Sequence, residues 1–207
     1  MFGKIKNKSI LILMMTVLLL LVCACAKKEE PAEEPTVPDT SETQETETGK
    51  VMVVYFSYTG NTKILAEYIA GLCEGDLYEI TAADPYTEDD TRYDADTRAY
   101  KEQHDPDCRP EIEGQLPDLS GYDTVFLGYP IWHSEAPKIC YTFLESVDVS
   151  GKRIIPFCTS AESPVGSSAL NLEALKPEAR WDEGIRLEVE MSKEEIADWL
   201  EALNLSE

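Results

Sequence analysis

The sequence predicts an α/β fold built on a parallel β-sheet. Short apolar runs typical of strands alternate with segments in which apolar residues recur at helical spacing, as in parallel sheets with crossover helices. The first run, at 51–56, is rich in β-branched and aromatic residues, as expected for a strand buried on both faces. The chain has 207 residues, which is enough for one domain with a sizeable core.

The expected elements follow one another along the chain. After the strand at 51–56, a helix begins at Lys63, because apolar residues recur every three or four positions up to residue 72. The polar segment 84–110 is expected to form a loop with one short helix near 93–103. Ser192 is expected to cap a closing amphipathic helix. The remaining expected elements are strands at 76–80, 122–128, 153–158 and 185–189, and helices at 138–147 and 193–203.

The first 25 residues have the layout of an export signal. Three lysines within the first nine residues precede an apolar stretch at 10–22, and small residues and cysteines follow. The run from Leu21 to Cys25 resembles the cleavage box of bacterial lipoproteins, which implies that Cys25 carries a lipid. A retained N-terminal helix is the alternative. In either case the domain is expected to be tethered to the extracytoplasmic face of the cell membrane.

The charge of the chain is strongly acidic and unevenly divided. Residues 26–49 consist mainly of Glu, Pro, Thr and Ser, so they are expected to form a disordered acidic linker in front of a domain at 50–207. Of the net charge of −22, residues 1–25 contribute +3 and residues 26–49 contribute −6, which leaves −19 for the domain. This charge argues against nucleic acid and anionic lipid head groups as partners. It would favour basic proteins, although a solvated acidic surface with no partner is the commoner meaning of such a charge.

The cysteines and histidines of the chain form no pattern typical of a metal site. The four cysteines after residue 50 form no CxxC pair, and no histidine stands at zinc-ligand spacing. We therefore expect no metal site. Three of these cysteines, at 73, 140 and 158, stand in helix or strand patterns where buried free thiols are ordinary, so we expect no disulfide. No side chain is convincingly placed as a general acid or base, so we expect no catalytic residue. His133 is expected to face solvent, because the sequence indicates no partner for it, and a hydrogen bond to a bound ligand or substrate is the alternative.

A hydroxyl-rich loop joins the first strand to the first helix and reads Ser57-Tyr58-Thr59-Gly60-Asn61-Thr62. The first turn of a helix carries unpaired N–H groups and the positive end of the helix dipole, so the loop is suited to bind a phosphate. A Thr or Asn cap on the helix is an equally good interpretation. The loop lacks the GKS/T of nucleoside-triphosphate loops and the GxGxxG of dinucleotide loops.

Three motifs of this chain resemble those of flavodoxins, which hold flavin mononucleotide (FMN). The run Tyr55 to Thr62 resembles the phosphate-binding loop, Leu127 to Trp132 the second flavin loop, and Ile155 to Ser160 with Gly166 the third. The combination is most similar to lipoprotein-type, flavodoxin-like domains of anaerobic Gram-positive bacteria. It implies a flavodoxin-like three-layer sandwich with a five-stranded parallel sheet in the order 2-1-3-4-5. The ligand would lie at the carboxyl ends of strands one and three.

The resemblance also implies the residues of the FMN site. Trp132 would stack on the flavin ring, since flat aromatic rings gain from both burial and geometry. The first motif would hold the phosphate, the second would line the ring and the third would complete the site. In that order, the residues are Ser57, Tyr58, Thr59, Gly60, Asn61 and Thr62; Tyr129, Pro130, Ile131 and Trp132; and Thr159, Ser160 and Gly166.

The third motif departs from the family pattern, because Ala161 to Val165 replaces a glycine-rich stretch. Pro164 removes an N–H donor. Glu162 would lower the reduction potential of the flavin if it faced the ring, and would have no effect if it faced solvent. The implied function is electron transfer by a membrane-tethered FMN protein with an unidentified redox partner. The alternatives are an FMN-dependent reductase of a quinone-like small molecule and a flavin-free binding module on the same fold.

Overall fold

The computed structural model describes residues 49–205. The predicted export signal, the predicted lipidation site Cys25 and all of the predicted linker except Gly49 lie outside the described residues. No helix within residues 49–205 is both long and apolar enough to cross a membrane.

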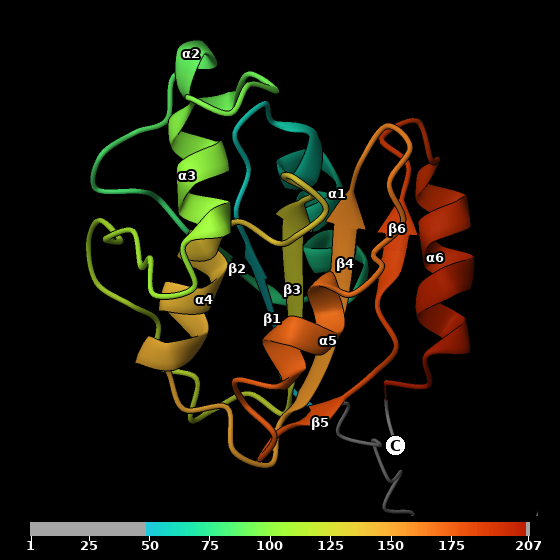
Figure 1. Ribbon diagram of the computed structural model, residues 1–207. Coiled ribbons are helices and arrows are strands. Elements are labelled where there is room, and N and C mark those ends of the chain that lie inside the picture. Colours follow the sequence, from blue (N-terminus) through green and yellow to red (C-terminus); the bar gives the residue numbers. More distant parts are fainter. Residues whose placement is uncertain (1–48, 206–207) are drawn as a thin grey trace, which may run out of the picture. The chain divides into compact units, whose positions relative to one another are not determined.

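A parallel sheet forms the centre of the domain, with its strands in the order β2-β1-β3-β4-β5 (Figure 1). This arrangement confirms the predicted fold class and the predicted order 2-1-3-4-5. A sixth short strand, β6, also pairs with β4. The strands are β1 Val51–Tyr55, β2 Asp76–Glu79, β3 Thr124–Pro130, β4 Arg153–Thr159, β5 Arg180–Trp181 and β6 Ile185–Leu187.

Two short strands, β5 and β6, share the outer edge of β4, because Pro156 interrupts the hydrogen bonding along that edge. β5 pairs with the first two residues of β4, and β6 pairs with residues 157–159. The carbonyl of Ile154 accepts a hydrogen bond from the N–H of Asp182 at 2.9 Å. Pro156 directs its backbone to the same edge, since alternate residues of a strand face the same neighbour, but it has no N–H to donate. The break between β5 and β6 therefore falls at this residue.

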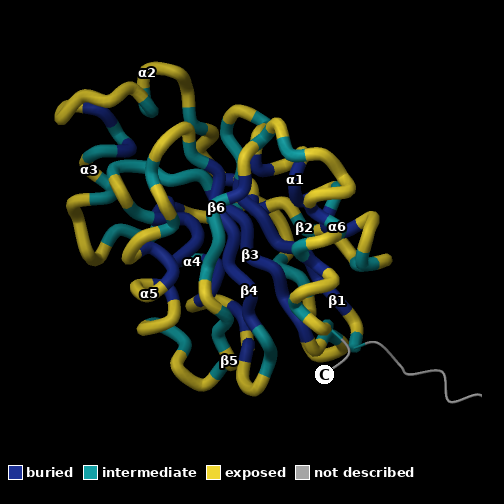
Figure 2. Tube along the Cα trace, turned by 90° about the vertical axis from the view of Figure 1, so that its right-hand side faces the viewer, coloured by how far each residue is buried: buried dark blue, intermediate teal, exposed yellow. Residues whose placement is uncertain are grey.

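The sheet separates two layers of core side chains, which alternate along each strand. Val53 and Tyr55 of β1 pack with the helices α1 and α6, whereas Met52 and Val54 belong to the layer beneath α4 and α5. Figure 2 shows β3 and β4 in the buried centre of the fold, with the exposed residues on the helices and loops around them. Burial on both faces explains why these strands are continuous apolar runs.

The helices cover both faces of the sheet. α1 begins two residues before the predicted start at Lys63. Ser192 caps α6 as predicted, since its hydroxyl accepts from the N–H of Glu195, whose carboxylate in turn accepts from the N–H of Ser192. The helices are α1 Asn61–Leu72, α2 Glu88–Thr91, α3 Arg98–His104, α4 Lys138–Ser146, α5 Ser168–Glu173 and α6 Lys193–Ala202.

Four features differ from the expectations. The expected fifth strand at 185–189 is the sixth strand, β6, and β5 was not predicted. The segment 84–110 contains two short helices, α2 and α3, because Thr87 and Thr97 each provide an N-terminal cap. Helix α5 was not predicted, since six residues are too few to show helical periodicity. β3 starts two residues late and extends to Pro130, where the strand ends and a missing N–H costs little.

Candidate functional site

The three loops that carry the motifs lie at one edge of the sheet. β1, β3 and β4 are parallel and their carboxyl ends are in register, with Tyr55 beside Gly128 and Pro130 beside Thr159. In doubly wound sheets, ligands bind at such an edge, outside the carboxyl ends of the strands. The loops that meet there are 56–60, 131–137 and 160–167.

The first loop leaves the start of α1 open. Gly60 occupies the N-cap position with a φ of 89°, a left-handed conformation that glycine adopts without strain. No described side chain caps the helix, so the alternative of a Thr or Asn cap is wrong. Ser57 stabilises the turn instead, because its Oγ accepts a hydrogen bond from the N–H of Gly60 at 3.1 Å. The first-turn N–H groups, which have no acidic neighbour in that turn, are left for another partner.

The side chains of this loop are divided between solvent and the interior. Thr59 and Asn61 are exposed, and Tyr58 is half-buried. Thr62 is only 1% exposed, and its Oγ1 lies 2.8 Å from Oγ1 of Thr159, which is also buried. These two hydroxyls join the first turn of α1 to the end of β4. The side chain of Thr62 therefore points into the fold, toward β4.

Tyr129 does not line this edge with its side chain. Its ring is fully buried beneath α4, and its hydroxyl lies 3.2 Å from Oγ of Ser168 at the start of α5. The expectation that this ring lines a flavin is therefore wrong. Burial raises the pKa of Tyr129 far above its ordinary value, so the phenol stays protonated. The next residues, Pro130 and Ile131, are half-buried, and the N–H of Ile131 donates to the carbonyl of Thr159 at 3.1 Å.

Trp132 belongs to an aromatic cluster at the carboxyl edge. Its indole meets Phe56 edge to face with the ring centroids 5.4 Å apart, and meets Tyr86 in the same way at 4.9 Å. Tyr58 lies farther away, at 6.5 Å. Edge-to-face contacts are favourable for aromatic rings. The indole is only half-buried, so part of it is accessible to a ligand. Tyr86 was not predicted as a site residue, because it is distant from the motifs in the chain.

A strained two-residue turn follows Trp132. Trp132 and Glu135 exchange backbone hydrogen bonds of 2.9 and 3.0 Å, and the two residues between them, His133 and Ser134, have φ values of 48° and 69°. A left-handed backbone costs a non-glycine residue roughly 1–2 kcal/mol. Strain of this kind concentrates at functional sites, and here it turns the chain sharply just after the indole.

Side chains from other parts of the fold hold the third loop. Arg186 of β6 donates hydrogen bonds to the carbonyls of Ser160 and Ala161, both at 3.1 Å. Glu135 accepts a hydrogen bond from the hydroxyl of Ser167 at 3.0 Å, and so links the second loop to the third. Neither Arg186 nor Glu135 was predicted, because these contacts join residues that are far apart in the sequence.

The third loop has a hydrogen bond of its own although it lacks the glycine-rich stretch. Oγ of Ser160 accepts from the N–H of Ser163 at 2.8 Å. Gly166 has a φ of 53°, in the left-handed region that favours glycine. Glu162 is exposed, which agrees with the solvent-facing alternative for this residue.

The two histidines of the chain come together beside Trp132. The ring centroid of His133 lies 6.3 Å from that of His104 and 5.3 Å from that of Tyr100, both in α3, and 4.6 Å from that of Tyr93. The expectation that His133 faces only solvent is therefore wrong. Partial burial lowers the pKa of His133, and the nearby His104 lowers it further.

We expect acid to weaken the contact between His133 and α3. The folded-state pKa of His133 lies below the ordinary 6.5, so the stability linked to this residue is complete above that value and is lost as the pH falls through the folded pKa. His133→Phe keeps a ring but cannot titrate. Between about pH 7.5 and 5.5, the free energy of unfolding should fall more for the native protein than for this variant. Equal decreases in urea unfolding would contradict this prediction.

Two cavities lie at opposite ends of β1. A cavity of about 140 Å³ adjoins the aromatic cluster at the carboxyl ends of β1 and β2, and is lined by residues that include Phe56, Tyr58 and Tyr86. A larger cavity of about 680 Å³ lies at the opposite end of β1 and is bordered by Gly49, the first described residue. Because the motifs converge at the carboxyl edge, we assign the candidate site to that edge and not to the larger cavity.

Solved structures show the same fold in proteins of two Bacteroides species. A protein from Bacteroides eggerthii DSM 20697 is 39% identical with a TM-score of 0.70, and the match covers 74% of this chain and 97% of that chain. A protein from Bacteroides uniformis ATCC 8492 is 38% identical with a TM-score of 0.71, over 74% of this chain and 98% of the other.

A more distant likeness shows the fold alone. The flavoprotein of Lactobacillus acidophilus NCFM, solved in complex with FMN, is 20% identical with a TM-score of 0.55, over 73% of this chain and 99% of that chain. No curated protein matches the sequence. The family model described as flavodoxin matches residues 50–203, which is most of the chain. The chain therefore belongs to the flavodoxin family.

Proposed function

We propose that this protein binds FMN at the carboxyl edge of the sheet and serves in electron transfer. The observation that carries the proposal is the open first turn of α1, where no described side chain caps the helix and no acidic residue stands. Such a turn binds phosphate through its N–H groups and the positive end of the helix dipole. Membership of the flavodoxin family supports FMN as the phosphate compound.

The residues around the turn fit this cofactor. Thr59 and Asn61 present exposed polar side chains beside the N–H groups of α1, and Ser57 keeps the turn in shape through its hydrogen bond with Gly60. Trp132 offers a half-buried indole as a wall for the flavin ring. When bound, FMN would supply the redox chemistry. The chain would bind the phosphate, orient the ring and shield part of it from water.

Charge and cavity size suggest two kinds of electron partner. A basic protein is favoured first, because the net charge of −19 on residues 50–207 would attract one over a long range. A quinone-like small molecule is the second candidate, which would make the protein a reductase. The cavity of about 140 Å³ beside Phe56, Tyr58 and Tyr86 is close in size to an engineered cavity of about 150 Å³ that holds benzene. Oxidation of the reduced protein by a quinone, without any partner protein, would favour the second candidate.

The visible absorption spectrum of the purified full-length protein tests the proposal, followed by titration with FMN under reducing conditions. We expect a yellow protein, or a colourless one that takes up FMN stoichiometrically with the absorption bands of bound flavin. Protein unfolded in urea serves as the control, because it has the same sequence but has lost the folded site at the carboxyl ends of the strands. A folded protein that ignores FMN would contradict the proposal and favour the flavin-free binding module.

We also propose that a lipid on Cys25 anchors the domain to the extracytoplasmic face of the membrane. The supporting observations are in the sequence alone: the lysines before the apolar stretch at 10–22, and the run from Leu21 to Cys25 that resembles a lipoprotein cleavage box. An anchor of this type attaches to the membrane without a spanning helix.

Cys25→Ala is expected to abolish attachment of the processed protein to membranes, because the lipid has no other acceptor in this scheme. Cys23→Ala is the matched control and should keep the processed protein in the membrane fraction. Fractionation of cells, with detection of both variants by immunoblot, makes the comparison. Processed Cys25→Ala protein that still sediments with membranes would contradict the proposed anchor.

A further inference from the structure

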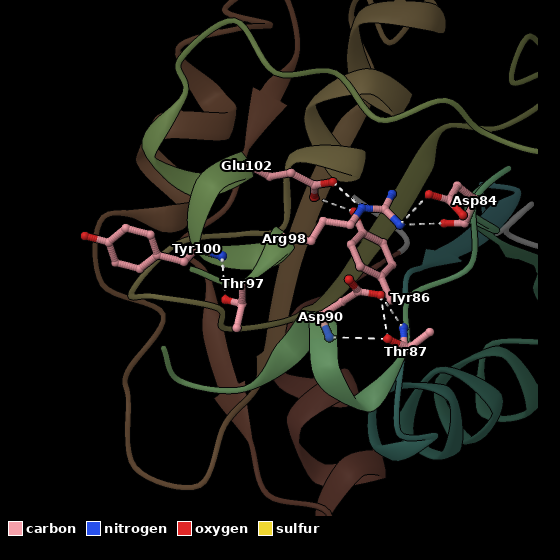
Figure 3. A network of polar contacts seen from close by, with 8 residues as sticks. All are labelled: Asp84, Tyr86, Thr87, Asp90, Thr97, Arg98, Tyr100 and Glu102. Carbon is pink, nitrogen blue, oxygen red and sulfur yellow. Dashed lines mark hydrogen bonds and ion pairs between the residues drawn. The ribbon is translucent and has the colours of Figure 1, made fainter. Parts of the chain in front are cut away.

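A cluster of three polar side chains lies beside Trp132 and consists of Tyr86, Arg98 and Glu102 (Figure 3). The guanidinium carbon of Arg98 lies 4.1 Å from the centroid of the Tyr86 ring. Nε of Arg98 donates to Oε1 of Glu102 at 2.6 Å, and the hydroxyl of Tyr86 donates to Oε2 of Glu102 at 2.6 Å. Each of the three side chains thus contacts the other two. Burial and the hydrogen bond to Glu102 raise the pKa of Tyr86, so its hydroxyl stays a donor.

Burial and outer contacts hold the cluster in place. The side chains of Arg98 and Glu102 are 23% and 12% exposed, so their ion pair is better shielded from water than a typical surface pair. Nη1 of Arg98 also donates to the carbonyl and the carboxylate of Asp84, at 3.0 and 3.1 Å. At the base of the segment, Ala82 and Ile112 form an antiparallel bridge that closes residues 84–110 into one unit.

The cluster reaches Trp132 by two routes. The ring of Tyr86 packs edge to face against the indole, with the centroids 4.9 Å apart. Gln103, which follows Glu102 in α3, donates from Nε2 to the carbonyls of Trp132 and Ala136, both at 3.0 Å. The first route holds the side chain of Trp132 and the second holds its backbone. The position of α3 therefore determines where the indole stands.

We propose that Tyr86, Arg98 and Glu102 are positioning residues that fix the Trp132 indole as a wall of the FMN site. This inference rests on the proposed function and deepens it, since it identifies what prepares the site for the flavin ring. A wall that is ordered before binding lowers the entropy lost when the ring arrives. In this proposal the segment 84–110 serves as a support of the site.

Arg98→Lys tests the inference, because lysine keeps the charge but loses the planar guanidinium that lies over Tyr86. The matched control is Arg109→Lys. Arg109 also pairs with a glutamate, Glu145, at 2.7 Å and also lies near a tyrosine ring, that of Tyr141, at 5.5 Å. It joins its loop to α4, however, and not to the turn of Trp132.

Two measurements on the full-length protein give the answer. In protein labelled with fluorotryptophan, the fluorine resonance of Trp132 is identified by its absence from Trp132→Phe. It should shift or broaden in Arg98→Lys and stay unchanged in Arg109→Lys. FMN affinity should fall about tenfold in Arg98→Lys, the order expected for coupled neighbours, and less than about twofold in the control. In a Trp132→Ala background, Arg98→Lys should cause no further loss.

The outcomes distinguish the inference from the proposed function. An unchanged Trp132 resonance in Arg98→Lys, or a loss of affinity equal to that of Arg109→Lys, would overturn the positioning role even if the native protein binds FMN. A native protein that binds no FMN would overturn the proposed function, and the fluorine spectrum would still decide whether the cluster positions Trp132. Tyr86→Phe removes only the hydroxyl that bonds Glu102. It should shift the same resonance, and an unchanged resonance would also count against the inference.

Discussion

Replacing Gly128 with valine is expected to lower the free energy of unfolding by about 3 kcal/mol, at the upper end of what overpacking of a tight core costs. Gly128 lies in β3 directly beside Phe157 of β4. A Cβ atom at position 128 would stand 2.2 Å from Cζ of Phe157, and this ring is fully buried, so it cannot move aside into solvent. Urea unfolding followed by circular dichroism measures the loss.

Two further variants show whether the clash is the cause. Gly71→Ala is a control of opposite sign: Gly71 lies inside α1, and a Cβ atom there would meet nothing within 4 Å. Alanine should therefore stabilise the protein by roughly 0.5–1 kcal/mol. Adding Phe157→Leu to Gly128→Val should recover part of the lost stability. If Gly128→Val unfolds at the native midpoint, the described contact between Gly128 and Phe157 is wrong.

The buried sheet is the part of the fold that could be predicted best from the sequence. The runs at 51–56 and 153–158 are almost wholly apolar, because their residues enter both core layers. The edge of the sheet was harder to predict. β5 has two residues, which is too few for a pattern, and the break at Pro156 depends on which strand pairs with which part of β4.

The segment 84–110 could not be predicted in the same way, because tertiary contacts determine its structure. Its helices have four and seven residues, which is too short for clear periodicity. Tyr86 and Glu102 are separated by 16 residues, and Gln103 and Trp132 by 29. Local patterns carry no information on pairs at such separations, so neither this support nor the neighbours of His133 could be inferred.

The sequence predicted where the candidate site lies in the fold, but it did not predict the role of every side chain there. The three motifs located the carboxyl edge, since loops that follow neighbouring parallel strands must meet there. The role of Tyr129 was wrong because it had been assigned by resemblance alone. Alternation along β3 places Tyr129 in the same core layer as Val125 and Leu127, facing away from the edge. Extending the third strand to residue 130 would have shown this.

Asn61→Asp is expected to weaken FMN binding by about a hundredfold or more while slightly stabilising the protein without flavin. Asn61 is the exposed first residue of α1. A carboxylate at this position interacts favourably with the helix dipole, by about 0.3–1 kcal/mol. The same carboxylate would repel the FMN phosphate, since like charges about 4 Å apart near a protein surface repel by about 4 kcal/mol. Fluorescence titration and urea unfolding measure the two effects.

Two controls show whether the loss of FMN affinity in Asn61→Asp comes from repulsion of the phosphate. Riboflavin has the same ring but no phosphate, so its affinity should not change. Asn204→Asp makes the same change of charge at an exposed residue beyond α6, and should leave FMN affinity unchanged. If Asn61→Asp binds FMN as tightly as the native protein does, the phosphate does not bind at the start of α1. If Asn61→Asp loses as much affinity for riboflavin as for FMN, the substitution has distorted the loop. Stability and FMN affinity should change in opposite directions only if the open turn of α1 is the phosphate site, so the two measurements together decide that assignment.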